Sequence, residues 1–162
     1  GAASSIALAY RLGKMRAMGR GNAVVVRYSA GKVETLEAAA SIVPGVLTAS
    51  QGCLFPADRW NTCNGSTCVL VDTYQDRSSE VSYKFLTAGS TATTETVDIC
   101  FTPGGKSYYR TGANTFKAMA SDNFLPRIQV WTGGASDQAQ SIVHTVYVLP
   151  NGASRVVARA GS

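Results

Sequence analysis

The first residues of the chain carry a helical pattern, and this pattern constrains the fold more than any other feature. Between residues 4 and 18, apolar side chains recur at steps of three and four, which is the period of an α-helix. Leu8, Leu12 and Met15 form the resulting stripe. We therefore expect a helix over residues 3–19 whose Leu8, Leu12 and Met15 pack on the rest of the molecule.

This helical pattern stops abruptly and is replaced by a β-strand pattern. Gly19 and Gly21 come first, and glycine commonly ends helices because it enters the left-handed region without steric cost. Three consecutive valines at 24–26 then favour a strand, since β-branched side chains fit strands better than helices. The chain is thus predicted to turn from a helix into a β-rich region that covers residues 23–160.

The β-rich region contains short runs of alternating apolar and polar residues, separated by turn signals. Antiparallel hairpins give this spacing, so an α+β fold with about seven to nine strands in antiparallel sheets is predicted. A length of 162 residues suits a single domain, 1–162. The expected strands cover residues 24–28, 32–37, 69–74, 81–85, 97–101, 107–110, 128–131, 142–149 and 155–159.

Four cysteines, three of them within a loop at about 51–68, allow either zinc binding or disulfides. Zinc sites usually show closely spaced cysteine pairs with histidine nearby, whereas here the only histidine is distant in sequence. An Asn64-Gly65 turn could bring the ends of its loop together. Disulfides are favoured, which indicates an oxidising compartment. Of the three connectivities, we prefer Cys63–Cys68 with Cys53–Cys100.

The net charge is +5, and its cations are distributed unevenly. Six basic residues precede the first acidic residue, Glu34, and two more lie near the other end of the chain. Such a distribution fits either a solvated surface or a surface that binds nucleic acid or anionic lipid. The candidate DNA contacts are Lys14, Arg16, Arg20, Arg155 and Arg159.

Catalytic motifs are not found in the sequence. His144 lies inside a strand pattern, and no nucleophile elbow, paired-histidine metal motif, phosphate loop or calcium loop is present. We therefore expect a protein that is not an enzyme and that needs no cofactor and no metal.

Three strings, in the right order, resemble the H-type minor pilins and pseudopilins (GspH/FimT-like). The junction MGRGNAVVV at 18–26 is similar to the family's turn from helix to strand. The string VDICFTPGG at 97–105 is similar to its strand and turn with proline and glycine, and VYVLPNGASRV at 146–156 is similar to its last hairpin. Together they span the chain from its helix to its last hairpin.

This resemblance implies a pilin-like head behind the continuation of a longer N-terminal helix. It implies a leader and a hydrophobic half-helix ahead of residue 1, which would anchor the subunit in the inner membrane of a Gram-negative envelope. The head would then lie in the periplasm or, after assembly, at a filament tip on the cell surface.

Two functions follow from the resemblance. The first is a non-enzymatic subunit that helps to initiate, or sits at the tip of, a type IV pilus or a type II secretion pseudopilus. Its partners would be other minor pilins or pseudopilins and the major subunit. The second is a DNA-binding minor pilin that acts in DNA uptake, with the five cations named above contacting phosphates.

Overall fold

The computed structural model describes residues 1–39, 50–54, 59–63, 67–76, 80–87, 92–121 and 125–161. Helix α1 runs from Ala2 to Arg20, close to the predicted bounds. Gly21 ends it in the left-handed conformation, with φ of 73°, and its N–H donates to the carbonyl oxygen of Ala17. The predicted Asn64-Gly65 turn lies outside the described residues.

All strand pairs in the described residues are antiparallel, and they form two sheets. The first sheet has the order β3-β2-β1-β6-β7-β8, with strands Cys68–Gln75, Lys32–Ala38, Val24–Ser29, Val97–Phe101, Ser107–Thr111 and Lys117–Ala118. The second has the order β11-β10-β9-β4-β5, with strands Ser154–Ala160, Ile142–Val148, Arg127–Thr132, Val81–Leu86 and Ala92–Thr93. Two 3-10 helices, Met119–Ser121 (η2) and Ala135–Gln140 (η3), complete the described elements.

The predicted α+β class is confirmed, although the strand number was underestimated. The two strands that the sequence pattern missed, β5 and β8, have two residues each. A two-residue strand is too short to show alternation, which explains why the pattern did not reveal it.

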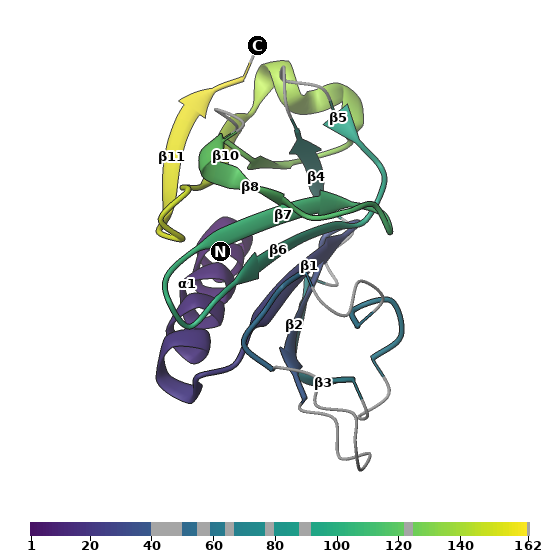
Figure 1. Ribbon diagram of the computed structural model, residues 1–162. Helices are drawn as coiled ribbons and strands as arrows, with labels where there is room; N and C mark the ends of the chain where they lie inside the picture. Colours follow the sequence, from purple (N-terminus) through teal and green to yellow (C-terminus); the bar gives the residue numbers. More distant parts are fainter. Residues whose placement is uncertain are drawn as a thin grey trace, which may run out of the picture.

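The helix packs on one face of the first sheet, and the second sheet closes the core at the beginning of the helix (Figure 1). Val24 and Val26 of β1 and Ile99 of β6 point towards α1 and are fully buried. Val146 of β10 and Ile128 of β9 join the same core from the second sheet. One apolar core therefore holds the helix and both sheets together.

A second, smaller core lies on the opposite face of the first sheet. Its centre is Trp60, which is fully buried and donates from its indole nitrogen to the carbonyl oxygen of Cys53. Val25 of β1 and Leu36 of β2 pack in the same cluster. The described parts of the cysteine loop thus cover the face of this sheet that α1 leaves free.

Candidate functional site

Helix α1 has two faces that both carry apolar residues, and only one of them is buried. The buried face packs closely on the first sheet. At Gly13, a Cβ atom would lie 2.5 Å from Cγ2 of Val26 and 3.6 Å from the ring of Phe101, so the helix approaches the sheet at a distance that only glycine permits. The buried face consists of Ala3, Ile6, Ala7, Tyr10, Gly13 and Ala17.

The outward face of α1 is the one that the sequence analysis predicted to be packed, and that prediction was wrong. Leu8 is 45% exposed, Leu12 47%, Met15 60% and Met18 55%. We call these four residues the outward stripe. Periodicity shows which residues share a face, but it does not show which of two apolar faces meets the sheet. The signal that was missed is the small-residue pattern of Ala3, Ala7, Gly13 and Ala17, since small residues allow close packing.

An apolar stripe of this kind is unusual for a surface helix. A helix that meets water on its outer side normally presents polar residues there, whereas apolar residues on both sides indicate a helix that is covered on both sides. The stripe runs over three turns from Leu8 to Met18, and none of its four residues belongs to the buried face of the helix. Exposed apolar surface that is continuous over several turns marks an interaction site.

Two arginines on the flank of α1 are used within the chain. Arg16 and Arg20 both bind the carboxylate of Glu37 on β2, and the Arg20 Nε–Glu37 Oε2 distance is 3.0 Å. The amide of Asn22 donates to the same carboxylate at 3.2 Å. Burial by itself would raise the pKa of Glu37, but these three hydrogen bonds hold that pKa below its usual value. The cluster fixes α1 to β2.

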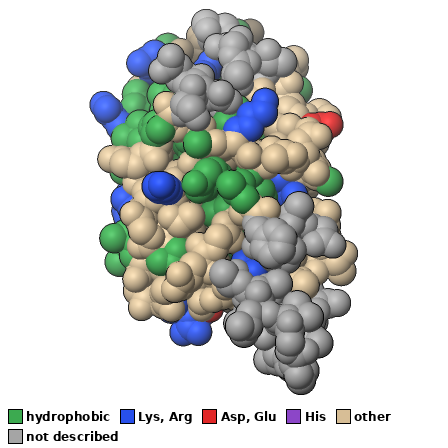
Figure 2. Space-filling model, in the orientation of Figure 1, with side chains coloured by type: hydrophobic (Ala, Val, Ile, Leu, Met, Phe, Trp, Pro, Cys, Tyr) green, Lys and Arg blue, Asp and Glu red, His purple; other side chains and the backbone are tan. Residues whose placement is uncertain are grey.

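The remaining predicted DNA contacts lie on other surfaces. Lys14 lies beside the turn at Gly152, because a Cβ there would meet its Cδ at 2.7 Å. Arg155 and Arg159 lie on β11, on the face of the second sheet that points away from α1. In the view of Figure 2, Lys and Arg side chains are spread over the surface. The structure therefore does not bring the five predicted contacts together.

Two disulfides stabilise the cysteine loop, in the connectivity that the sequence analysis preferred. Cys53 is joined to Cys100 on β6, with a Cα–Cα distance of 6.1 Å, and Cys63 is joined to Cys68 on β3 at 4.9 Å. Within the described ranges, no group of three His, Cys, Asp or Glu residues is arranged to hold a metal ion.

A buried ion-pair cluster holds the same loop from the first sheet. Asp98 on β6 accepts from Nε of Arg27 at 2.7 Å and from Nε of Arg110 at 2.9 Å. Arg27 also donates from Nη2 to the carbonyl oxygen of Trp60, at 2.6 Å. Both carboxylate oxygens of Asp98 are thereby used, so this cluster positions the loop.

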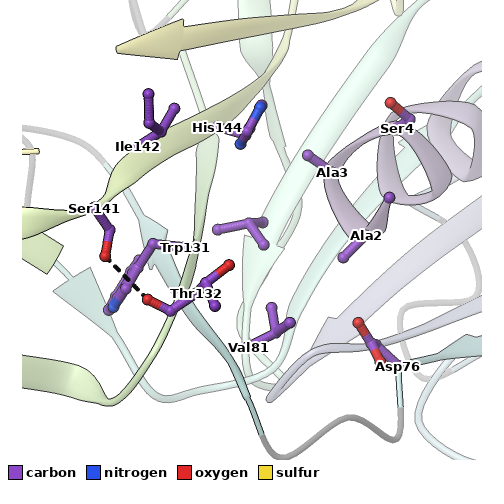
Figure 3. Close-up of a pocket in the computed structure, with 12 residues that line it drawn as sticks. Ala2, Ala3, Ser4, Asp76, Val81, Trp131, Thr132, Ser141, Ile142 and His144 are labelled. Atoms are coloured by element: carbon purple, nitrogen blue, oxygen red, sulfur yellow. Dashed lines mark hydrogen bonds between the residues drawn. The ribbon is translucent and has the colours of Figure 1, made fainter. Parts of the chain in front are cut away.

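A cavity of about 640 Å³ lies between the first residues of α1 and the second sheet (Figure 3). Ile142, which is 60% exposed, lines it together with Trp131 and Val130. His144 and Asp76 also line it, but they lie well apart, and the hydrogen bond drawn in Figure 3 joins Ser141 to the backbone of Thr132. This arrangement provides no nucleophile paired with a base.

The architecture of one helix on two antiparallel sheets matches a solved structure. The crystal structure of the type IV minor pilin FimU of Pseudomonas aeruginosa aligns with a TM-score of 0.51, over 99% of this chain and 91% of that chain. The two sequences are 9% identical. This chain shares the pilin fold. No protein-family model and no curated protein matches the sequence.

The likeness to FimU establishes the fold alone. Evidence for a function has to come from the exposed residues of this chain. Of the described helices, none has the length and hydropathy that would let it cross a bilayer. Packing within the chain does not account for the apolar residues of the outward stripe. The stripe is therefore the strongest candidate for a functional surface.

Proposed function

We propose that this chain is a non-enzymatic minor pilin or pseudopilin of the H type. It would help to initiate, or sit at the tip of, a type IV pilus or type II secretion pseudopilus in a Gram-negative envelope. The outward stripe of α1 is the observation that supports this proposal most directly. In the assembled filament, the stripe packs against the helices of neighbouring minor and major subunits.

The energetics of the stripe agree with this role. Leu8, Leu12 and Met15 are each about half exposed, so assembly would remove a substantial apolar area of each side chain from contact with water. Burial of a large apolar side chain is worth roughly 1.5–3 kcal/mol when complete, and half of that when the side chain is half buried already. Such a stripe provides a driving force for association while leaving the fold of the single subunit unchanged.

The test is a pull-down of the other minor subunits with the chain carrying Leu12→Asp. We expect the variant to fold normally, since Leu12 is 47% exposed and lies outside the buried core, and to recover much less of its partners. Leu54→Asp is the matched control, because Leu54 is 48% exposed but lies in the cysteine loop. Equal recovery by wild type, Leu12→Asp and Leu54→Asp would contradict the proposal.

DNA uptake is not supported by a comparable surface. Arg16 and Arg20 are engaged by Glu37, and of the five predicted contacts only Arg155 and Arg159 share a strand. If the chain did bind duplex DNA through five phosphates, its affinity would fall steeply between about 50 and 200 mM salt. Fluorescence anisotropy at both concentrations measures this, and we expect little binding at either.

A further inference from the structure

Strand β11 forms an open edge of the second sheet. It spans seven residues, and only its β10 side is paired within the described residues. Five of these seven residues are exposed, including Val156, which is 37% exposed. In Figure 1, β11 is the yellow strand at the outer margin of the molecule, between the helix and the C-terminus.

The hydrogen bonds at the two ends of the β10–β11 hairpin show which backbone groups point outwards. The N–H of Leu149 donates to the oxygen of Ala153, and the N–H of Gly161 donates to the oxygen of Ser141, both at 2.8 Å. In an antiparallel pair, hydrogen-bonded and non-hydrogen-bonded positions alternate. The two residues that bond to the β10 side, Ala153 and Gly161, flank β11 and both have odd numbers. The even-numbered residues of β11 therefore direct their N–H and C=O groups outwards. These positions are Ser154, Val156, Ala158 and Ala160.

The edge also lacks the usual protection against strand pairing. Natural edge strands are interrupted by bulges or prolines, or carry charges. The edge strand of the first sheet, β3, has a register shift opposite Thr35 and Leu36. Strand β11 keeps an unbroken register from Ser154 to Ala160 and contains no proline. Its protection is limited to the charges of Arg155 and Arg159 and, at its first residue, to the hydrogen bond from Ser154 Oγ to the backbone oxygen of Ala7 on α1.

The side chains of β11 define what can pair with it. Val156 stands beside the buried Val146, so Val156 and Ala158 lie on the side of the sheet that faces α1, with one residue between them. Arg155 and Arg159 project from the opposite face, four residues apart, beside Tyr147 and Val143. Among the described residues, no acidic side chain pairs with either arginine.

A second copy of this chain is a poor partner in the register that pairs all seven residues of the edge. If two β11 strands paired antiparallel about Val157, Arg155 of one would face Arg159 of the other, and like charges directly opposite are destabilising. The same two positions attract a strand whose acidic residues are also four apart.

We propose that the open edge of β11 pairs with an extended, acidic segment of another protein. The segment adds a sixth strand to the second sheet, with Asp or Glu opposite Arg155 and Arg159 and apolar residues opposite Val156 and Ala158. Its pattern is therefore acidic, apolar, any residue, apolar, acidic. Backbone hydrogen bonds provide the affinity, and the alternating side chains provide the specificity.

The test uses a labelled, end-capped peptide with the core Glu-Val-Thr-Val-Glu and a second peptide with Lys in place of Glu. We expect saturable binding of the acidic peptide by fluorescence anisotropy and none of the basic one. Ala158→Pro removes one outward N–H without removing a bond to β10, and it should weaken binding by about tenfold. Equal affinity of wild type and Ala158→Pro would contradict strand pairing.

Charge reversal tests the specificity. Arg155→Glu with Arg159→Glu should abolish binding of the acidic peptide and create binding of the basic one. The matched control is Lys32→Glu with Lys117→Glu, two cations on strands β2 and β8 of the first sheet, which changes the net charge equally and should leave acidic-peptide binding nearly unchanged. If both double variants lose binding to the same degree, the attraction is one of net charge and the proposal fails.

Amide hydrogen exchange tests the geometry. In the free chain, the amides of Val156, Ala158 and Ala160 should exchange fast and those of Arg155 and Val157 slowly, and the acidic peptide should slow the fast set. Two results would overturn the proposal: dimerisation through β11 at rising concentration, or duplex DNA that binds β11 more tightly than the peptide and is unaffected by Ala158→Pro.

Discussion

At the scale of single residues, Gly13 sets how close α1 comes to the first sheet. In a helix interior, alanine is normally better than glycine by about 1 kcal/mol. At Gly13 the added methyl group would overlap Cγ2 of Val26, a stiff side chain in the middle of a strand. We therefore expect Gly13→Ala to lower the free energy of unfolding by about 1–3 kcal/mol in urea denaturation.

Gly19 provides the control for this prediction. A Cβ atom there meets nothing within 4 Å, and the residue lies in the last turn of the same helix. Gly19→Ala should leave stability unchanged or raise it by up to about 1 kcal/mol. If both variants shift stability in the same direction, close packing at Gly13 is not what decides the result.

Asp98 is the buried counter-ion of two arginines, Arg27 and Arg110. Its side chain is 1% exposed and that of Arg110 is 2% exposed. Asp98→Ala would leave Arg27 and Arg110 without their counter-ion, and removal of one member of a buried pair costs about 3–5 kcal/mol. Chemical denaturation should show this loss, whereas Glu34→Ala, which breaks the partly exposed pair with Lys32 and removes a weaker attraction to Arg27, should cost about 0–1 kcal/mol.

Glu37 makes stability depend on pH. Its pKa is lowered in the folded chain, so its contribution is complete above the pKa of the unfolded chain, about 4.3, and is lost as the pH falls through the lower folded value. Glu37→Gln removes this contribution. The free energy of unfolding should therefore decrease less between pH 6 and pH 3 in the variant than in wild type, and parallel curves would contradict this.

At the scale of elements, helix α1 shows how far sequence reasoning reaches. The bounds of α1 were predictable, because the apolar period marks where the helix begins and the glycines mark where it ends. Its orientation was not, because Leu8, Leu12 and Met15 repeat with the same period as Ile6, Tyr10 and Gly13 on the other side. The choice between the two faces is made by close packing with Val26 and Phe101, which are distant in sequence.

The two disulfides should contribute unequally to stability. Cys53 and Cys100 are 47 residues apart in sequence, whereas Cys63 and Cys68 are 5 apart. Since the entropy removed from the unfolded chain grows with loop length, Cys53→Ala with Cys100→Ala should cost about 4 kcal/mol and Cys63→Ala with Cys68→Ala about 2 kcal/mol. Thermal unfolding of the two double variants under oxidising conditions measures the difference. A larger loss from the shorter loop would contradict it.

At the scale of the whole molecule, the antiparallel sheets followed from hairpin spacing and turn residues. The order of strands within each sheet did not, since β6 inserts beside β1 although about seventy residues separate Arg27 from its partner Asp98. Local patterns do not encode such pairings. For the same reason the sequence grouped five cations into one DNA-binding set, whereas folding places Arg16 and Arg20 on Glu37 and moves Arg155 and Arg159 to another surface.

The Cys53–Cys100 bond has a mechanical consequence. When the ends of the chain are pulled apart, the 47-residue segment between these two cysteines cannot extend. The unfolded chain is therefore shorter by roughly 160 Å than it would be without this bond. The Cys63–Cys68 bond lies inside that segment, so breaking it alone adds no length. Optical-tweezer unfolding should therefore show this additional extension only when Cys53–Cys100 is reduced. A subunit under tension in a filament would keep its first sheet tethered to the cysteine loop even after the second sheet had been pulled open.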